Sequence, residues 1–472
     1  MNASDVPAAL STSFERQRAS YNGAAFPEWN VRRDRLQRLQ RLVADHETAI
    51  EQAIDADFGG RPRLETQIAE IFPSLAEIRG ALKHGARWMR PRGAWVSKWF
   101  LPARAQVMPR PLGVVGIIVP WNYPLYLAVG PLVGALVAGN RALVKMSEFT
   151  PAFSQLFADL AARYFPAEEV EVITGGPDVA AQFSALPFDH LLFTGSTNVG
   201  RHVMAAAAQN LTPVTLELGG KSPTIVAPGY PLERAAERVL AGKLLNAGQT
   251  CIAPDYVLVP RVGIQDFVAA LQRQAVRMYP RGLQDPDYCS VVNPRHYGRL
   301  IGYLDQAAAA GVKGVPLFGG ADRNDEQHRL APTVLVDPPV SLAAMREEIF
   351  GPVLPVLGYD RVEEAVAYVN AQPRPLALYW FDDDVQRARW ALGQTHAGGV
   401  CVNETLMHVA QEELPFGGVG PSGMGHYHGK WGFDTFSKLT PVFFQSRLNG
   451  MSLFMPPYRP IVGRMLKLMK RF

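Results

Sequence analysis

The spacing of apolar and polar positions changes several times along the chain. Within residues 31–54 apolar side chains recur at helical spacing, and roughly the first 90 residues are predicted to be helical. From residue 113 to about residue 218, short apolar runs typical of buried strands alternate with stretches typical of helices. A second alternating set begins near residue 231. This alternation predicts an α/β protein with a doubly wound, Rossmann-like parallel sheet followed by a second α/β unit.

The individual elements follow from this pattern. In the first unit we expect strands at 113–119, 142–146, 169–174 and 190–195, with helices at 123–138, 151–165 and 196–209. In the second unit, helices at 233–246 and 264–276 flank a strand at 256–260. Thr150 is expected to cap the helix that begins with Pro151.

The uncharged run over residues 111–139 is long enough to resemble a membrane span. Pro120, Pro124 and Pro131 punctuate the run, and Asn122 lies within it, so a single spanning helix would be broken early. We therefore interpret the run as a buried strand, a turn and a helix.

Composition restricts the class of protein further. At 472 residues the chain predicts two or three domains, and its 48% hydrophobic and 19% charged residues are typical of a soluble globular protein. Its three cysteines are far apart and lack metal-ligand spacing, which argues against a disulfide framework and against a zinc site. With no evident secretory signal, we predict a cytoplasmic protein without a metal.

The charge is concentrated at the C-terminus. Seven basic residues and no acidic residue follow Asp434. The charge of this segment, +7, is larger than the net charge of the whole chain, +4. The last turns place Ile461, Met465, Leu468 and Phe472 near one helical face. Such a tail could rest on an anionic membrane surface, but packing on the parent fold or on a second subunit is favoured. Because base-stacking aromatic residues do not alternate with its charges, a nucleic-acid role has no support.

Several short motifs lie where a doubly wound sheet presents ligands. Gly195 and Gly200 in FTGSTNVGR stand at a strand-to-helix junction, and Gly219 closes the strand of TLELGG. Lys145 and Glu148 end another strand in VKMSE. Taken singly, these are ordinary turn glycines and an ordinary solvated ion pair.

Their combination is more specific. The ordered motifs PWNYP, VKMSE, FTGSTNVG, LELGGK, NAGQTC, EEIFGP and LPFGGVGPSGMG resemble the aldehyde dehydrogenase superfamily from about Pro111 to Lys438. The stretch from His408 to Lys438 is similar to the class 3 branch, and most of all to its bacterial coniferyl aldehyde dehydrogenases. The resemblance implies NAD(P)-dependent oxidation of a long-chain or aromatic aldehyde by a homodimer.

The resemblance also implies three catalytic roles. Cys251 matches the nucleophile, Asn122 the side-chain donor to the oxyanion, and Glu217 the base that activates water. A free thiol has a pKa of about 8.5, so we expect activation by a base or by the positive field of bound nicotinamide. Glu217 lies between Leu216 and Leu218, which is consistent with a buried carboxyl of raised pKa.

Cofactor and substrate residues follow from the same resemblance. Lys145 and Glu148 would bind the adenosine ribose; because an acid there repels a 2′-phosphate, NAD is favoured, while NADP stays open. Glu348 would hold the nicotinamide ribose with Phe350 beside it. Further residues expected to line the dinucleotide site are Trp121, Gly195, Ser196, Val199 and Gly219. Candidates for a substrate tunnel are Tyr123, His408 and Phe416, together with His428, which would help anchor the C-terminal segment over its mouth.

The expected domain organisation combines both lines of reasoning. Residues 1–95 and 111–216 would bind the dinucleotide, 217–400 would form the catalytic domain, 96–110 and 430–447 an oligomerisation arm, and 448–472 the basic tail. Two alternatives remain. An acyl-transferring enzyme of the same fold would pass the thioester to coenzyme A, although Glu217 counts against it. A catalytically silent binding or structural protein is disfavoured because Cys251, Glu217 and Asn122 are all present.

Overall fold

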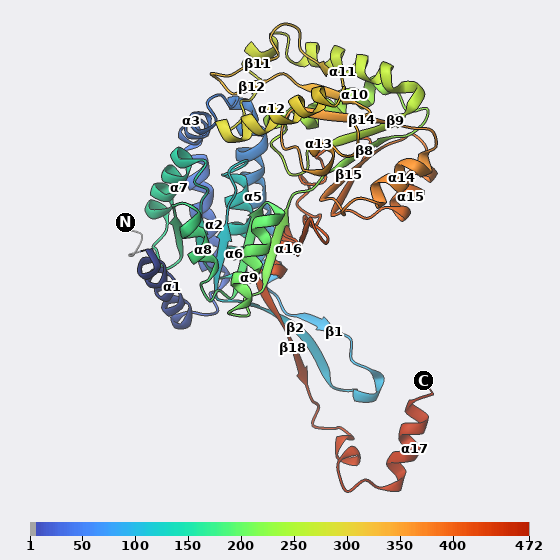
Figure 1. Cartoon of the computed structure of the whole chain (residues 1–472). Helices are drawn as coiled ribbons and strands as arrows, with labels where there is room; N and C mark the ends of the chain where they lie inside the picture. The colour runs from blue at the N-terminus through green and yellow to red at the C-terminus, as the bar shows by residue number, and fades with distance from the viewer. Residues whose placement is uncertain (1–5, 472) are drawn as a thin grey trace.

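The computed structural model describes residues 6–471 and arranges them as two parallel sheets and a projecting arm (Figure 1). Its N-terminal helices are α1 (Val6–Gly23), α2 (Trp29–Ala44), α3 (Glu47–Phe58), α4 (Arg63–Thr66) and α5 (Phe72–Trp88). The helical pattern over residues 31–54 is divided between α2 and α3, because the amide of Asp45 closes α2 on the carbonyls of Arg41 and Val43. One continuous apolar periodicity therefore spans two helices.

The first sheet has the order β17-β7-β6-β3-β4-β5. Its strands are β3 (Val114–Ile118), β4 (Arg141–Lys145), β5 (Val170–Ile173), β6 (His190–Gly195), β7 (Val214–Leu218) and β17 (Gly423–Met424). All pairs are parallel except β17 with β7. The strand order reverses between β3 and β6, and the carboxyl ends at such a reversal form the crevice in which α/β sheets bind ligands. The predicted doubly wound sheet is confirmed.

Helices cover both faces of this sheet. Those that follow its strands are α6 (Tyr126–Ala138), α7 (Pro151–Tyr164), α8 (Pro177–Ser184) and α9 (Thr197–Ala208). Contacts place α6 and α7 with α2 on one face, whereas α8 and α9 lie with α1 on the other. Thr150 precedes α7 as predicted, but its side chain does not cap the helix. Its ψ of 63° is outside the extended region from which a cap residue reaches the first turn.

The run over residues 111–139 forms β3 and α6, as interpreted from its prolines. Pro131 lies inside α6, and Gly139 ends the helix with a φ of 101°. Within residues 6–471, no helix is both long enough and apolar enough to cross a membrane. Asn140 then fixes the start of β3: its Oδ1 accepts from the amides of Leu112 and Gly113, and its Nδ2 donates to the carbonyls of Ala135 and Phe436.

The second sheet has the order β10-β13-β14-β9-β8-β15-β16. Its strands are β8 (Pro223–Val226), β9 (Tyr256–Pro260), β10 (Gly314–Pro316), β13 (Thr333–Val336), β14 (Val353–Tyr359), β15 (Ala377–Phe381) and β16 (Gly399–Val402). Only the edge strand β10 is antiparallel to its neighbour. The accompanying helices are α10 (Leu232–Leu244), α11 (Ile264–Met278), α12 (Pro294–Ala309), α13 (Ala343–Arg346), α14 (Val362–Asn370) and α15 (Val385–Gln394), and a short hairpin joins β11 (Arg323–Asn324) to β12 (Arg329–Leu330).

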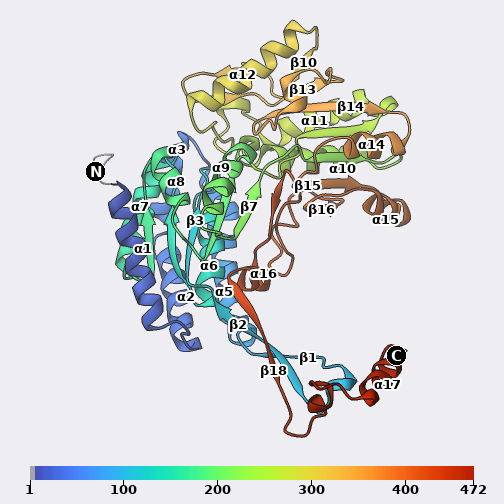
Figure 2. The ribbon, with the colours of Figure 1, turned by 60° about the horizontal axis from the view of Figure 1, so that its bottom comes forward.

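A three-stranded antiparallel arm projects from the first sheet, beyond α16 (Gly429–Thr435) (Figures 1 and 2). Its strands are β1 (Arg92–Ala94), β2 (Arg104–Pro111) and β18 (Ser437–Phe444). The tail turns back at the end of the arm and finishes in α17 (Pro460–Met469). A cavity of about 410 Å³ separates the tail from the arm tip and is lined by Trp99, Phe100, Leu101, Met451, Leu453, Phe454 and Met465, among others. The tail therefore faces its own arm across this cavity; Phe472, expected on its apolar face, lies outside the described residues.

Candidate active site

Cys251 follows an unusually strained turn. Asn246, Ala247 and Gly248 adopt φ angles of 55°, 51° and 78° in succession. A run of residues in the left-handed region persists only where surrounding contacts stabilise it. Here the side chain of Gln249 provides such contacts. Its Nε2 donates to the carbonyls of Asn246 and Ser290, and its Oε1 accepts from the amide of Val292. The motif NAGQTC thus forms a rigid turn that presents the thiol.

Asn122 joins this turn from the first sheet. It follows β3, and its Nδ2 donates to the carbonyl of Gln249 at 3.1 Å. In return, Nδ2 of Asn246 donates to the carbonyl of Asn122 at 3.0 Å. These two reciprocal hydrogen bonds join residues 127 and 124 positions apart in sequence, and they hold the amide of Asn122 beside the turn that precedes Cys251.

Glu217 lies near the carboxyl end of β7, in register with Gly423 of β17. Its residue is only 2% exposed, and neither carboxylate oxygen has a hydrogen-bond partner. Burial alone raises the pKa of this carboxyl well above 4.5. The expected burial of Glu217 is confirmed, and a buried carboxyl without partners is unusual enough to indicate a functional group.

These three side chains line one cavity of about 200 Å³. It opens beyond the carboxyl ends of β3 and β6, at the reversal of strand order. The lining residues are Pro120, Trp121, Asn122, Thr194, Gly195, Ser196, Glu217, Gly219, Cys251, His296, Glu348 and Phe350. The structure therefore brings together residues that the sequence separates by more than two hundred positions.

The thiol is not activated by its protein surroundings. Desolvation, and then the carboxylates of Glu348 and Glu217, raise the pKa of Cys251 to about 12, although its own amide and that of Ile252 act in the opposite direction. In the protein alone, both nearby carboxylates therefore oppose ionisation of the Cys251 thiol. The positive field of a bound nicotinamide would act in the opposite direction and lower this pKa.

The cavity fits a dinucleotide at its nicotinamide end. Glu348 is half-buried, its Oε1 is buried without a hydrogen-bond partner, and desolvation followed by the charge of Asp255 raises its pKa to about 8. A Cβ at position 219 would lie only 2.0 Å from Oε2 of Glu348, so Gly219 leaves the space that this carboxylate uses. Ser196 caps α9 through the amide of Val199, and the start of this helix faces the same crevice, where it favours an anion.

Three predicted cofactor residues lie elsewhere. Lys145 and Glu148 are not among the residues that line this cavity, and Val199 is 46% exposed on the first turn of α9. Lys145 is 1% exposed and donates to the carbonyl of Met146, so the alternative of a solvated ion pair is wrong. Burial lowers the pKa of Lys145, and the charge of Glu148 partly restores it.

Three of the four proposed tunnel residues form an aromatic cluster, and none of the four lines the cavity at Cys251. Phe416 stacks on His428 with ring centroids 5.3 Å apart, and His408 lies 6.2 Å from Phe416. Tyr123 is 8% exposed and its hydroxyl bonds that of Thr250, next to Cys251. His428 is 1% exposed and bonds the Tyr126 hydroxyl at 3.1 Å. In a single chain His428 therefore does not anchor the C-terminal segment, which lies at the far end of the arm (Figure 2).

His296 was missed by reasoning from the sequence. It lies near the start of α12, and its ring packs 5.0 Å from that of Trp121 at the cavity wall. Nothing in NPRHY distinguishes this histidine from one on a helix surface. Thr194 and Pro120 were likewise not singled out, and only their positions beside Gly195 and Trp121 connect them with the site. Within the described chain, no group of three His, Cys, Asp or Glu residues could hold a metal ion.

A doubly wound sheet that brings a thiol, a carboxamide and a buried carboxylate into one cavity is the arrangement expected of an oxidoreductase that uses a cysteine nucleophile. Residues 2–442 match the model of the aldehyde dehydrogenase family, and the chain belongs to this family. It is thus an enzyme that oxidises aldehydes to acids with NAD or NADP.

The similarity to known proteins extends over nearly the whole chain. A probable coniferyl aldehyde dehydrogenase of Pseudomonas aeruginosa is 52% identical, with 97% of this chain and 95% of the relative covered. A coniferyl aldehyde dehydrogenase of a Pseudomonas species is 43% identical, with coverages of 98% and 96%. A substrate-bound aldehyde dehydrogenase structure from Staphylococcus aureus has a TM-score of 0.92 at 38% identity, with 97% and 99% covered. An indole-3-acetaldehyde dehydrogenase of P. syringae in complex with NAD+ has a TM-score of 0.84 at 25% identity, with 93% and 89% covered.

Proposed function

We propose that the enzyme oxidises aromatic, cinnamyl-type aldehydes, such as coniferyl aldehyde, through a thioester on Cys251. The observation that carries the proposed mechanism is the single cavity shared by Cys251, Asn122 and Glu217. The substrate class is supported by the two coniferyl aldehyde dehydrogenases reported above. Long-chain aldehydes are the second class to be tested.

The first step forms the bond between carbon and sulfur. With the thiol proton lost to solvent, the Cys251 thiolate attacks the carbonyl carbon while the carbonyl electron pair moves to oxygen, and the oxyanion of a thiohemiacetal results. The Asn122 amide and the backbone N–H of Cys251 donate to that oxygen. A donor of this kind is commonly worth about 3 kcal/mol of transition-state stabilisation.

When bound, the oxidised nicotinamide supplies the hydride acceptor that converts the thiohemiacetal into a thioester. Glu348 would hold its ribose, while Trp121 and Phe350 flank the space beside it, with ring centroids 5.4 Å apart. Gly195 and Ser196 would approach the pyrophosphate at the start of α9. Glu217 then removes a proton from water; the resulting hydroxide attacks the thioester, the carbon–sulfur bond breaks, and the acid leaves with the thiolate restored.

Cofactor choice is assigned to Glu148. An acid near the adenosine ribose disfavours the 2′-phosphate of NADP, so we expect NAD to be preferred. The ratio of kcat/KM for NAD to that for NADP should fall when Glu148 is replaced by Gln. An unchanged ratio would show that Glu148 does not determine the preference for NAD over NADP.

The arm supports a homodimer. Its strand β18 exposes Leu439, Phe443 and Phe444 by 39%, 51% and 50%, more apolar surface than a solvated strand usually carries. We assign to subunit contact the arm strands within the predicted segments 96–110 and 430–447, which are β2 and β18; residues 430–435 belong to α16, which packs on α5 and α6. Light scattering should report twice the chain mass. The free thiols of Cys251, Cys289 and Cys401 suit a reducing, cytoplasmic compartment, which cell fractionation would test.

The function is tested by following reduced nicotinamide with purified protein, NAD or NADP, and a panel of short, long-chain and cinnamyl-type aldehydes. Highest kcat/KM on the cinnamyl-type aldehydes is expected, with no turnover by the Cys251→Ala variant. Equal rates with and without coenzyme A would exclude acyl transfer to that thiol. A preference for decanal over coniferyl aldehyde would contradict the proposed substrate class.

A further inference from the structure

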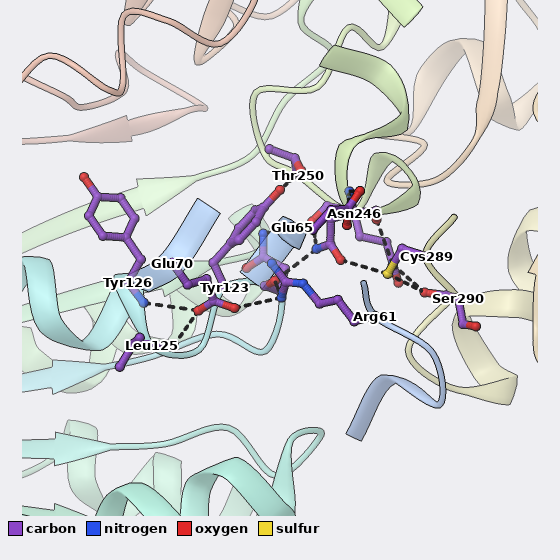
Figure 3. A network of polar contacts seen from close by, with 12 residues as sticks. Arg61, Glu65, Glu70, Tyr123, Leu125, Tyr126, Asn246, Thr250, Cys289 and Ser290 are labelled. Atoms are coloured by element: carbon purple, nitrogen blue, oxygen red, sulfur yellow. Dashed lines mark hydrogen bonds and ion pairs between the residues drawn. The ribbon is translucent and has the colours of Figure 1, made fainter. Parts of the chain in front are cut away.

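A buried ion pair between Arg61 and Glu70 lies beside the segment that carries Tyr123, Leu125 and Tyr126 (Figure 3). Nη1 of Arg61 is 2.8 Å from Oε1 of Glu70, and both side chains are 0% exposed. Arg61 comes from the loop between α3 and α4, and Glu70 from the π-helical turn Gln67–Ile71 that leads into α5. Both residues belong to the N-terminal helical region, which holds none of the motifs that identify the family.

This pair contacts the Asn122 turn on both sides. Nη1 of Arg61 donates to the carbonyl of Asn122 at 3.0 Å. Oε2 of Glu70 accepts from the amides of Leu125 and Tyr126 at 2.7 and 3.2 Å, at the start of α6. The Arg61 guanidinium also lies over the ring of Tyr123, 4.9 Å from its centroid. Four of the five consecutive residues from Asn122 to Tyr126 are thus contacted by one ion pair.

The contact bears directly on the oxyanion donor. The segment that carries Asn122 is not part of a strand, so the orientation of its peptide depends on the donors that hydrogen-bond the Asn122 carbonyl. These donors are Arg61 and Asn246. The other end of the same residue, Nδ2, bonds the Gln249 carbonyl next to the nucleophile turn. Loss of the Arg61 donor would allow the peptide of Asn122 to rotate, and its side chain would turn with it.

Stability alone is a poor reason for such a pair. Removing two charges from water is costly, and well-packed apolar replacements of a buried ion pair are often equally stable or more stable. Here the cost is higher, because Nε and Nη2 of Arg61 are buried without hydrogen-bond partners. A directional role explains what stability does not, since only a fixed guanidinium supplies a donor of defined orientation.

We propose that Arg61, oriented by Glu70, is a positioning residue that aims the Asn122 amide at the oxyanion formed on the substrate. The inference rests on the oxyanion role proposed above for Asn122. It assigns to the N-terminal helical region a part in the chemical step, in addition to its part in the cofactor-binding fold.

A double-mutant cycle tests this assignment. Arg61→Met, Asn122→Ala and the double variant are compared with the wild type by stopped-flow measurement of the first turnover, at saturating NAD and aldehyde. We expect Arg61→Met to slow the first turnover about 10-fold, with unchanged NAD affinity, and Arg61→Lys to recover part of the rate. In the Asn122→Ala background, which should itself be slower by about 100-fold, Arg61→Met should cost less than twofold.

Arg32 provides a matched control. It is also a buried arginine that donates to backbone carbonyls, those of Pro27, Val137 and Ala138, but it contacts neither catalytic turn. Arg32→Met should lower the thermal midpoint while leaving the first-turnover rate of the folded enzyme within twofold. If Arg61→Met does not fold, the cycle is run with Arg61→Lys.

The outcomes are distinct. Equal losses from the Arg61 variant in the wild-type and Asn122→Ala backgrounds would overturn the positioning role and leave a purely structural one. A wild-type rate for Arg61→Met would also overturn it. A wild-type rate for Asn122→Ala would instead refute the oxyanion assignment of the proposed function, independently of Arg61.

Discussion

Gly219 is the position at which the cofactor site should tolerate a side chain least. A Cβ there would lie 2.0 Å from Oε2 and 2.4 Å from Oε1 of Glu348. Since ordinary contact begins at 3.4 Å, Gly219→Ala must displace the nearer oxygen by about 1.4 Å, the difference between 3.4 and 2.0 Å. The carboxylate ends a flexible side chain, so we expect the fold to survive, whereas a displacement above 1 Å can cost about 100-fold in rate.

The assay is kcat/KM for NAD, together with NAD binding by fluorescence titration. Gly219→Ala should lower kcat/KM for NAD by about 100-fold, with a thermal midpoint close to that of the wild type. Gly302→Ala is the control, because its Cβ would meet nothing within 4 Å. If the effect passes through Glu348, Gly219→Ala should cost little in a Glu348→Ala background. Wild-type NAD binding by Gly219→Ala, or an equal loss in both backgrounds, would refute the reasoning.

Three further predictions concern hydrolysis, pH dependence and stability. Glu217→Gln should retain the first turnover but slow the steady state at least about 100-fold, because thioester hydrolysis loses its base; quenched-flow detection of a burst checks this. Burial raises the pKa of Glu348 in the folded state from 4.5 to about 8. The unfolded state therefore loses this proton first, and the free energy of unfolding falls as pH rises between these values. Calorimetry should show that Glu348→Gln gains thermal stability relative to the wild type over that interval. Asn140→Ala removes four hydrogen bonds between the arm root, α6 and β3, and should cost about 2–4 kcal/mol in unfolding free energy by urea titration; a loss below about 1 kcal/mol would contradict this.

Reasoning from sequence found residues that lie together where they belong to contiguous motifs. NAGQTC, PWNYP and LELGG led to Cys251, Asn122 and Glu217, which line one cavity. The alternating pattern predicted the doubly wound sheet, because strands buried on both faces read as short apolar runs.

What the sequence could not supply were contacts between distant segments. His296 and Arg61 lie in no motif, and only tertiary packing brings them to the site. The direction of the Cys251 pKa depends on desolvation and on two carboxylates 34 residues before and 97 residues after it in the chain, which no local pattern encodes. The Thr150 cap failed for a related reason, since a cap needs a particular backbone conformation as well as a suitable residue.

The most direct test of the account is intact-protein and peptide mass spectrometry of the Glu217→Gln variant after acid quench with NAD and coniferyl aldehyde. The account predicts a mass increase equal to one acyl group, located on the peptide that contains Cys251 and absent from the Glu217→Gln, Cys251→Ala double variant. Reduced nicotinamide formed without such an adduct, or an acyl group on Cys289 or Cys401, would contradict Cys251 as the nucleophile.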